Sequence, residues 1–282
     1  DAKTPLFISI FTNIVNIGAS YWLTLGQGLG ISGIALGTII AQYTSLILAL
    51  VVYQVKYSKI CSRIALRDSL DRNSLKKFLC INRDVFLRSF SVTLAYTIFT
   101  RVSANISDEI LAIDTLLMQL FTLYSYLFDG VGYAAEALSG KYIGMRDHKG
   151  FRTSVKALMI WAVCVSTFFI LLFAVVGNQI MTIFEPSGNI ARAASKFLIY
   201  IIIIPIAGFA PYLFDGILLG ATHVKPLRNT VFIATIVFIA SLAIIVPSLG
   251  NDGLWISFVI FTSMRGILLI PTMKAIYGNG IK

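Results

Sequence analysis

The amino-acid sequence predicts an all-α polytopic membrane protein, a bundle of about eight transmembrane helices. Hydrophobic residues make up 57% of its 282 residues, charged residues make up 13%, and the mean hydropathy is +0.84. These values are typical of helical membrane proteins and lie outside the range of soluble domains. The net charge of +10 is carried mainly between the apolar runs, so membrane topology explains it without a nucleic-acid partner.

Each of the eight predicted spans has the roughly 20 apolar residues that a bilayer requires. They are predicted at 5–26, 31–55, 84–105, 108–139, 154–176, 193–220, 226–248 and 253–276. The fourth and the sixth are longer than a bilayer requires, so we expect them to tilt, bend or protrude.

Every second connection between these spans is rich in Lys and Arg. The basic connections are 56–83, 140–152 and 221–228, and the connections without bases are 26–30, 104–110, 177–190 and 249–252. Because basic loops are retained in the cytoplasm, both termini of this segment and the basic connections are predicted there. The alternation also supports the number of spans.

The predicted spans fall into two groups. Residues 1–55 hold two spans, 56–83 form a basic cytoplasmic linker, and 84–282 form a six-span C-terminal bundle. A faint repeat relates the groups, because Gly30-x-x-Gly33 before the second span matches Gly250-x-x-Gly253 before the eighth. Since transporters are often built from repeats, we expect residues 1–55 to be the last two spans of an incomplete N-terminal bundle.

Polar residues form a stripe along the fourth span, which is otherwise apolar. A carboxylate inside a bilayer costs roughly 2.5–3.5 kcal/mol. Several acids on one helix therefore predict a wet or partnered interior. The candidate residues on this span are Asp114, Gln119, Ser125, Asp129 and Glu136.

A second polar span repeats part of the first. Leu127-Phe128-Asp129-Gly130 recurs as Leu213-Phe214-Asp215-Gly216. Asp129 lies twelve residues before Lys141, and Asp215 lies ten before Lys225. At a rise of about 1.5 Å per residue both aspartates lie roughly 15–18 Å inside the helix ends. We therefore expect them to face a common cavity near the middle of the membrane.

Two carboxylates at such a depth can bind a proton, a small cation or a cationic substrate and exchange one for another. That exchange is antiport. In the alternative reading, the aspartates pair with Arg265, which lies about 13 Å deep by the same rise, or cap broken helices. Arg88 lies toward the end of its span, where we expect its side chain to extend to the membrane surface.

The other acids on the fourth span give weaker signals. Glu136 is five residues from Lys141, so it is expected closer to the membrane surface. Asp114 follows Asp108 and is expected near the outer end, where water solvates it. Gln119 either lines a cavity or forms a hydrogen bond between helices.

Three further polar residues are predicted to line a pathway: Asn13, Asn16 and Ser125. Asn13 and Asn16 are three residues apart and therefore share one face of the first span. A hydrogen bond to a neighbouring helix is the alternative for this pair.

No enzyme motif is found in the sequence. Its two histidines, His148 and His223, lie in predicted cytoplasmic connections, where they cannot form a site within the membrane. The chain has neither a GxxxxGK[ST] phosphate loop nor a GxSxG nucleophile elbow. We therefore expect no catalysis, no metal site and no ATP-driven pumping by this chain itself.

Several motifs resemble the multidrug and toxic compound extrusion (MATE) family, and its DinF-like branch most closely. They are Asn82-Arg83-Asp84-x-Phe86-Leu87-Arg88, Phe128-Asp129-Gly130 followed by Ala134-Ala135-Glu136-Ala137-Leu138-x-Gly140, and Asp215-Gly216-Ile217-x-x-Gly220-Ala221. Gln119 and Asn13-x-x-Asn16-Ile17 fit the same family. The resemblance covers nearly the whole chain.

The resemblance implies twelve spans in two six-span bundles that alternate between inward-open and outward-open states, with this chain beginning at the fifth. It implies export of cationic or amphipathic compounds against an inward flow of H⁺ or Na⁺, with no other cofactor. We expect a monomer in the bacterial inner membrane, whose partners are membrane lipids and a small-molecule substrate. Two departures leave coupling in the N-terminal bundle unassigned, since the family's first-span aspartate is absent and Ser20 replaces a frequent acid.

The sequence therefore predicts a secondary antiporter in which Asp129, Asp215 and Glu136 bind the cation or substrate. A flippase for lipid-linked oligosaccharides shares the implied architecture, but it would be favoured by a wide, arginine-rich cavity, and Arg265 is the only deep arginine predicted. A structural or signalling subunit, with its acids as ion-pair staples, is the alternative from another class.

Overall fold

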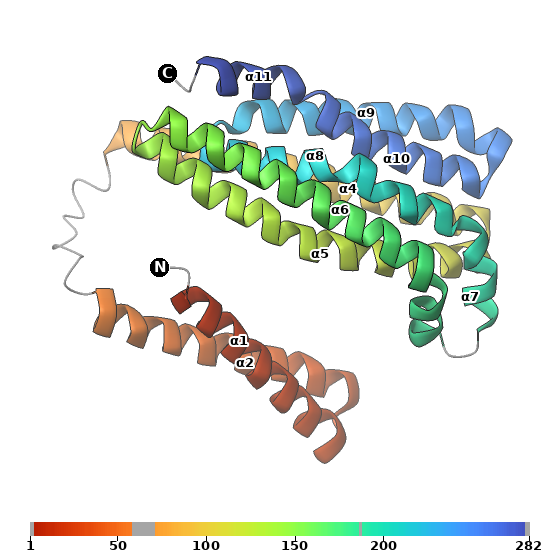
Figure 1. Cartoon of the computed structure of the whole chain (residues 1–282). Coiled ribbons are helices and arrows are strands. Elements are labelled where there is room, and N and C mark those ends of the chain that lie inside the picture. Colours follow the sequence, from red (N-terminus) through yellow and green to blue (C-terminus); the bar gives the residue numbers. More distant parts are fainter. Residues whose placement is uncertain (1–2, 58–70, 186–187, 280–282) are drawn as a thin grey trace. The chain divides into compact units, whose positions relative to one another are not determined.

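The computed structural model describes residues 3–57, 71–185 and 188–279, and all regular structure in these ranges is helical (Figure 1). The all-α prediction is confirmed. Residues 58–70 of the predicted linker, 56–83, lie outside the described residues. The chain forms two compact units, Asp1–Leu75 and Lys76–Lys282.

The first unit is a hairpin of two helices with π-helical ends. Its elements are α1 (Lys3–Tyr21), η1 (Trp22–Gly26), α2 (Gly30–Val52) and η2 (Tyr53–Tyr57). Gly37 lets the two helices approach closely, because a Cβ there would collide with Ser20. Across the same interface, Thr12 Oγ1 donates to Ser45 Oγ at 2.7 Å. Most large apolar side chains of this unit are exposed, as expected of membrane helices.

The second unit holds the remaining helices. They are α4 (Arg72–Ile106), α5 (Asp108–Gly144), α6 (His148–Phe184), α7 (Asn189–Ala194), the 3₁₀ turn η3 (Ser195–Phe197), α8 (Leu198–Gly220), α9 (Val224–Leu249), α10 (Asn251–Ile267) and α11 (Ile270–Asn279). Helix α8 packs against α5, α6 and α10 and is therefore central to the unit.

Short, capped turns separate the long helices of this unit. Ser107 begins α5, and its side chain accepts a hydrogen bond from the Ile110 N–H at 3.1 Å. Asp147 begins α6 in the same way, with Oδ1 accepting from the Gly150 N–H at 2.9 Å. Such caps satisfy backbone donors that a helix start leaves free. Gly250, with φ of 56°, separates α9 from α10 in a single residue, and glycine tolerates this left-handed conformation.

Helices α5 and α8 approach one another most closely at glycines. A Cβ on Gly216 would collide with the backbone of Gly132, and a Cβ on Gly220 would collide with the backbone of Glu136. This approach places the segments that carry Asp129 and Asp215 side by side. In the second copy of the Phe-Asp-Gly motif, Gly216 lets its helix pack closely, whereas nothing lies within 4 Å of a Cβ on Gly130 of the first copy.

Among the described residues, seven helical stretches are long and apolar enough to cross a membrane: Lys3–Gly26, Gly30–Lys56, Asp108–Gly144, His148–Phe184, Asn189–Gly220, Val224–Leu249 and Asn251–Gly278. All seven contain predicted spans. The eighth prediction, 84–105, is helical within α4 but is not among the seven. Charged residues such as Arg83, Asp84, Arg88 and Arg101 reduce its hydropathy, and two of them, Asp84 and Arg88, form ion pairs with other helices.

Candidate functional site

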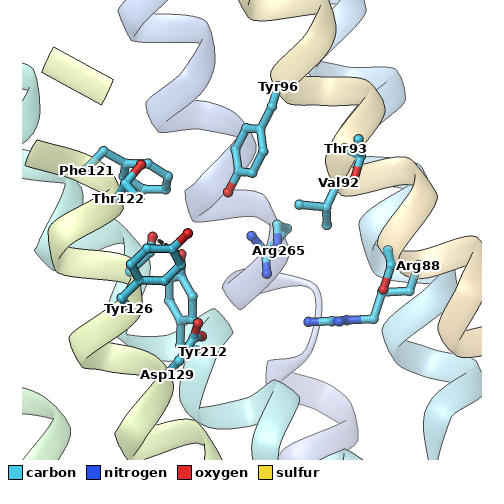
Figure 2. Close-up of a pocket in the computed structure, with 12 residues that line it drawn as sticks. Arg88, Val92, Thr93, Tyr96, Phe121, Thr122, Tyr126, Asp129, Tyr212 and Arg265 are labelled. Carbon is cyan, nitrogen blue, oxygen red and sulfur yellow. Dashed lines mark hydrogen bonds between the residues drawn. The ribbon is translucent and has the colours of Figure 1, made fainter. Parts of the chain in front are cut away.

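A cavity of about 390 Å³ lies among α4, α5, α8 and α10 of the second unit (Figure 2). The lining residues of α4 and of α5 follow the helical repeat, so each of these two helices contributes one face. They are Arg88, Ser89, Val92, Thr93 and Tyr96 of α4, Phe121, Thr122, Ser125, Tyr126 and Asp129 of α5, Tyr212 of α8 and Arg265 of α10. The predicted polar stripe therefore faces a real cavity along part of its length.

Asp215 lies beside this cavity and is held by two arginines. Its side chain is buried, with 5% of the residue exposed, and Oδ2 accepts hydrogen bonds from Arg88 Nη2 and from Arg265 Nη2, the latter at 3.0 Å. Asp215 Oδ1 has no hydrogen-bond partner among the described residues. Two cations thus share one carboxylate oxygen while the other oxygen is free. A buried charge needs such partners, because an unpaired ion in a low-dielectric interior is costly.

Asp129 differs from Asp215 in its surroundings. Its side chain is half-buried, lines the cavity and forms no ion pair in the ranges that the structure describes. Arg88, Arg265 and Asp215 are all close enough for their charges to act on it. The two aspartates therefore lie near one another, but only Asp129 is among the residues that line the cavity, and Asp215 is engaged by arginine.

Aromatic side chains form the remaining wall of the cavity. Tyr212 OH and Ser125 Oγ are hydrogen-bonded at 2.5 Å, joining α8 to α5. The Arg265 guanidinium lies 5.8 Å from the centre of the Tyr212 ring, a distance at which the ring face attracts a cation. In Figure 2, Tyr96 and Arg88 extend from α4 toward Arg265, with Tyr126, Asp129 and Tyr212 across the cavity. Ser125, predicted to line a pathway, thus lies in the cavity wall.

The structure corrects the expectation for Arg88. We expected its side chain to extend to the membrane surface, but it turns into the bundle, lines the cavity and pairs with Asp215. Helix α4 begins at Arg72, so Arg88 lies well inside the helix. The spacing of Arg88, Val92 and Tyr96 at four-residue steps was the signal that could have identified it.

The structure also corrects the expectation for Asp114. Its side chain is not solvated, since only 1% of the residue is exposed. Oδ1 accepts hydrogen bonds from Asn251 Nδ2 at 2.9 Å and from Trp255 Nε1 at 2.8 Å, and Oδ2 accepts one from Ser103 Oγ at 2.6 Å. The N-terminal end of α10 covers this position and shields it from bulk water.

The two other candidates on α5 lie outside the cavity that contains Asp129. Gln119 is exposed and lines a separate cavity of about 230 Å³, together with Asp114. Glu136 is exposed and belongs to neither cavity. Their predicted roles in binding stay predictions, and the second unit does not bring them next to Asp129.

The asparagines of the first unit differ from each other. Asn16 Nδ2 donates to Thr38 Oγ1 at 3.2 Å, which joins α1 to α2. Asn16 therefore forms the hydrogen bond between helices that was the alternative prediction. Asn13 is exposed within its unit, and its role in a pathway stays a prediction.

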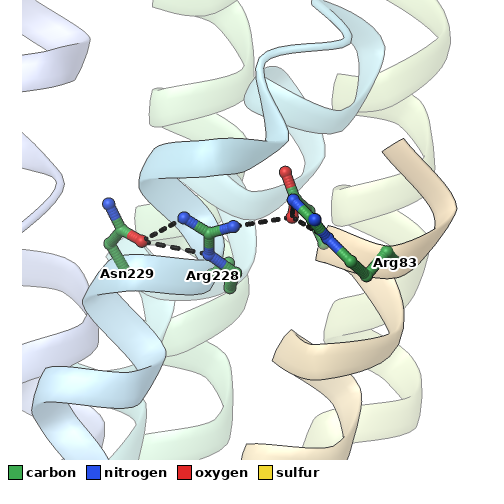
Figure 3. A network of polar contacts seen from close by, with 4 residues as sticks. Arg83, Arg228 and Asn229 are labelled. Atoms are coloured by element: carbon green, nitrogen blue, oxygen red, sulfur yellow. Dashed lines mark hydrogen bonds and ion pairs between the residues drawn. The ribbon is translucent and has the colours of Figure 1, made fainter. Parts of the chain in front are cut away.

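A second ionic cluster lies at the predicted cytoplasmic end of α4 and was not foreseen. The Asp84 carboxylate is buried and accepts from Arg228 Nη1 of α9 at 2.7 Å and from Arg83 at 3.1 Å. Arg228 also donates to Asn229 Oδ1 at 2.8 Å (Figure 3). This cluster fastens α4 to α9.

Comparisons with known proteins agree with these observations. A family model described as MatE matches residues 85–245, more than half of the chain. DNA damage-inducible protein F of Escherichia coli (strain K12) is 31% identical over 281 residues, which are 99% of this chain and 61% of that protein. Protein DETOXIFICATION 45, chloroplastic, of Arabidopsis thaliana is 21% identical over 94% of this chain and 46% of its own length.

Solved structures have the same fold. An outward-facing multidrug resistance MATE family transporter of the MOP superfamily gives a TM-score of 0.85 at 16% identity, over 98% of this chain and 62% of that one. A MOP superfamily transporter from Pyrococcus furiosus, described by the reverse polarity of its binding pocket, gives 0.80 at 17% identity, over 96% and 62%. With its apolar helices, its motifs and its family match, this chain is a multi-pass membrane protein that belongs to the MatE family.

Proposed function

We propose that this chain serves in a secondary active transporter that exports cationic or amphipathic small molecules by H⁺- or Na⁺-coupled antiport with alternating access. The observation that carries the proposal is the unequal state of two acids at one cavity. Asp215 is held by two arginines, whereas Asp129 faces the cavity without an ion pair among the described residues.

The Asp129 carboxylate faces the cavity and is therefore suited to bind a cation. Asp129 is half-buried, so a bound cation would be partly removed from water and attracted more strongly than at the surface. Tyr126 and Tyr212 line the same cavity and offer ring faces to an amphipathic cation. We therefore assign substrate binding to Asp129 and the aromatic wall.

The charges around the cavity explain why a substrate and a coupling ion would exchange with one another. When all four groups are ionised, Arg88 and Arg265 contribute +2 and Asp129 and Asp215 contribute −2, so the group is formally neutral. One bound cation or proton makes it positive, and a second then meets repulsion. Substrate and coupling ion thus exclude one another, which antiport requires.

The proposal also includes the location, the oligomeric state and the partners of the protein. The location is the bacterial inner membrane, and the basic connections support an orientation with both termini of this segment in the cytoplasm. We propose a monomer that contacts membrane lipids and a small-molecule substrate, uses H⁺ or Na⁺ as its coupling ion, needs no other cofactor, and is not an enzyme.

Transport by the intact protein in liposomes tests this proposal, with ethidium as the probe cation. We expect Asp129→Asn to lower ethidium-driven H⁺ or Na⁺ exchange at least tenfold, which corresponds to about 1.4 kcal/mol of lost binding. Glu109→Gln is the matched control, because Glu109 is an exposed acid at the start of the same helix. Unchanged exchange in Asp129→Asn would remove Asp129 from the mechanism, and no exchange in the unmodified protein would favour the structural or signalling subunit.

One observation favours a flippase as the second candidate. The cavity contains two arginines, Arg88 and Arg265, where the sequence predicted one. An anionic lipid-linked sugar could pair with them only if Asp215 released them. Faster movement of a fluorescent anionic lipid than of ethidium in the same liposomes would favour this reading.

A further inference from the structure

The two oxygens of the buried Asp114 have different kinds of partner. Oδ1 receives the Asn251 amide and the Trp255 indole N–H, and both of these groups are donors. Oδ2 faces the Ser103 hydroxyl, which can donate or accept. The same positions of the heavy atoms therefore suit an ionised carboxylate, to which Ser103 donates, and a protonated carboxyl, whose O–H donates to Ser103 Oγ.

The surroundings of Asp114 supply no counter-charge. Charged and titratable side chains do occur on the helices packed against it: Arg101 of α4, Asp108 and Glu109 of α5, Arg192 of α7, Tyr200 of α8 and Asp252 of α10. None of them forms an ion pair with Asp114 in the ranges described, and Asp252 Oδ1 accepts from Tyr200 OH at 2.8 Å. A buried carboxylate without a cation is costly, because no nearby positive charge offsets the loss of its hydration. The neutral form therefore suits this position better.

Asp114 also has a route for protons. Together with Ser103 it lines the cavity of about 230 Å³, whose wall includes the side chains of Thr100, Thr115 and Gln119. These groups can hydrogen-bond to water. Thr122 lines both this cavity and the one that contains Asp129. Polar groups thus extend along the α4–α5 interface from one acid to the other.

We propose that Asp114 is a proton-binding carboxyl, separate from Asp129 and Asp215, that exchanges its proton with water in the adjoining cavity. On binding, a proton passes from cavity water to Asp114 Oδ2, and the new O–H donates to Ser103 Oγ. On release, the proton returns to water and the serine hydroxyl turns to donate. The use of this proton in coupling rests on the proposed antiport, whereas its binding does not.

Infrared difference spectroscopy of the intact protein in lipid tests the proton directly. A protonated carboxyl has a C=O stretching band that an ionised carboxylate lacks. We expect the unmodified protein to show such a band near neutral pH, Asp114→Asn to lack it, and Asp252→Asn, which changes an exposed acid on α10, to keep it. Identical spectra for the unmodified protein and Asp114→Asn at every pH would overturn the proposal.

A second variant tests the same geometry without changing the acid. Trp255→Phe keeps an aromatic ring but removes one donor to Oδ1, so the C=O band of Asp114 should move to higher wavenumber. This variant decides the matter if Asp114→Asn does not fold. A band that does not move would show that it belongs to another group and would overturn the assignment.

Transport measurements separate this inference from the proposed function. Asp114→Asn resembles the protonated state, because its amide can donate to Ser103 Oγ while its oxygen accepts from α10. In the ethidium assay we expect it to exchange fewer protons for each ethidium while ethidium still binds. If the infrared band is present but exchange is unchanged, coupling through Asp114 is wrong. If Asp129→Asn is the variant without effect, Asp129 is removed from the mechanism instead, and if the unmodified protein shows no exchange, the proposed function fails.

Discussion

Arg265 of α10 donates from Nη2 to Asp215 Oδ2 of α8 at 3.0 Å, and both side chains are buried. The same oxygen also accepts from Arg88 of α4. One acid thus holds two cations from different helices, and its removal would leave both without their shared partner. The stability of the second unit should therefore depend on Asp215 more than on Asp129.

Asp215→Asn should destabilise the protein. Breaking a buried ion pair by removing one partner typically costs about 3–5 kcal/mol, because the remaining charge stays buried. We expect a lower midpoint of thermal unfolding in detergent, while Asp129→Asn, which breaks no ion pair in the described ranges, should unfold close to the unmodified protein.

The double variant Asp215→Asn with Arg265→Gln checks the cause. It removes one of the two cations, so it should recover part of the lost stability. A double variant less stable than Asp215→Asn alone would mean that Arg265 stabilises the bundle through packing rather than through its charge.

The closest contact between α5 and α8 can be tested with a pair of glycines. Gly216→Ala should destabilise the second unit by about 1–3 kcal/mol, because its Cβ would overlap the Gly132 backbone and force the helices apart. Gly130→Ala is the control, since nothing lies within 4 Å of a Cβ there. The two midpoints of thermal unfolding should differ clearly, and equal midpoints would show that α8 can shift without cost.

The two arginines at Asp84 should contribute unequally. Arg228 is 2.7 Å from Asp84, and 27% of its side chain is exposed, whereas Arg83 is 3.1 Å away with 59% exposed. Exposed ion pairs are screened by water and contribute little. We expect Arg228→Ala to speed amide hydrogen exchange near Asp84 in α4, measured by mass spectrometry, and Arg83→Ala to leave it nearly unchanged. The reverse order would contradict the structure.

The hydrogen bond between Tyr212 and Ser125 should stabilise the protein modestly. Tyr212→Phe keeps the ring that lies beside Arg265 and removes the hydroxyl, so we expect a loss of about 0.5–1.5 kcal/mol. Tyr212→Ala also removes the half-buried ring, and a larger loss than that of Tyr212→Phe is expected. Chemical or thermal unfolding of both variants in detergent measures the difference, and similar losses would show that the ring contributes little.

The sequence predicted the acids of the site better than their partners. Depth in the membrane can be counted along one helix, so Asp129 and Asp215 could be placed at one level before the structure was known. Arg88 was misplaced because its depth was counted from the expected span end, whereas α4 begins at Arg72. An arginine side chain can point into the bundle or toward the membrane surface. Which of the two it does depends on whether a neighbouring helix supplies an acid as its partner.

Asp114 shows the same limit more clearly. Its donors, Ser103, Asn251 and Trp255, come from two other helices, and no spacing within α5 reveals them. For the fold, hydropathy and charge alternation were sufficient for the seven apolar stretches. Helix α4 was harder to classify, because its charged residues lower its hydropathy. Some of these residues contact other helices rather than water.

Helix α4 meets its neighbours at three levels through carboxylates: Asp84 with Arg228, Arg88 with Asp215, and Ser103 with Asp114. Helices α5, α8 and α10 also approach one another through backbone or small groups, at Gly216, Gly220 and Gly266. Contacts of the second kind do not respond to protons, whereas each of the first kind weakens or reverses when its acid is neutralised. Because α4 takes part in all three of these carboxylate contacts, its position on the bundle can respond to pH and to cations.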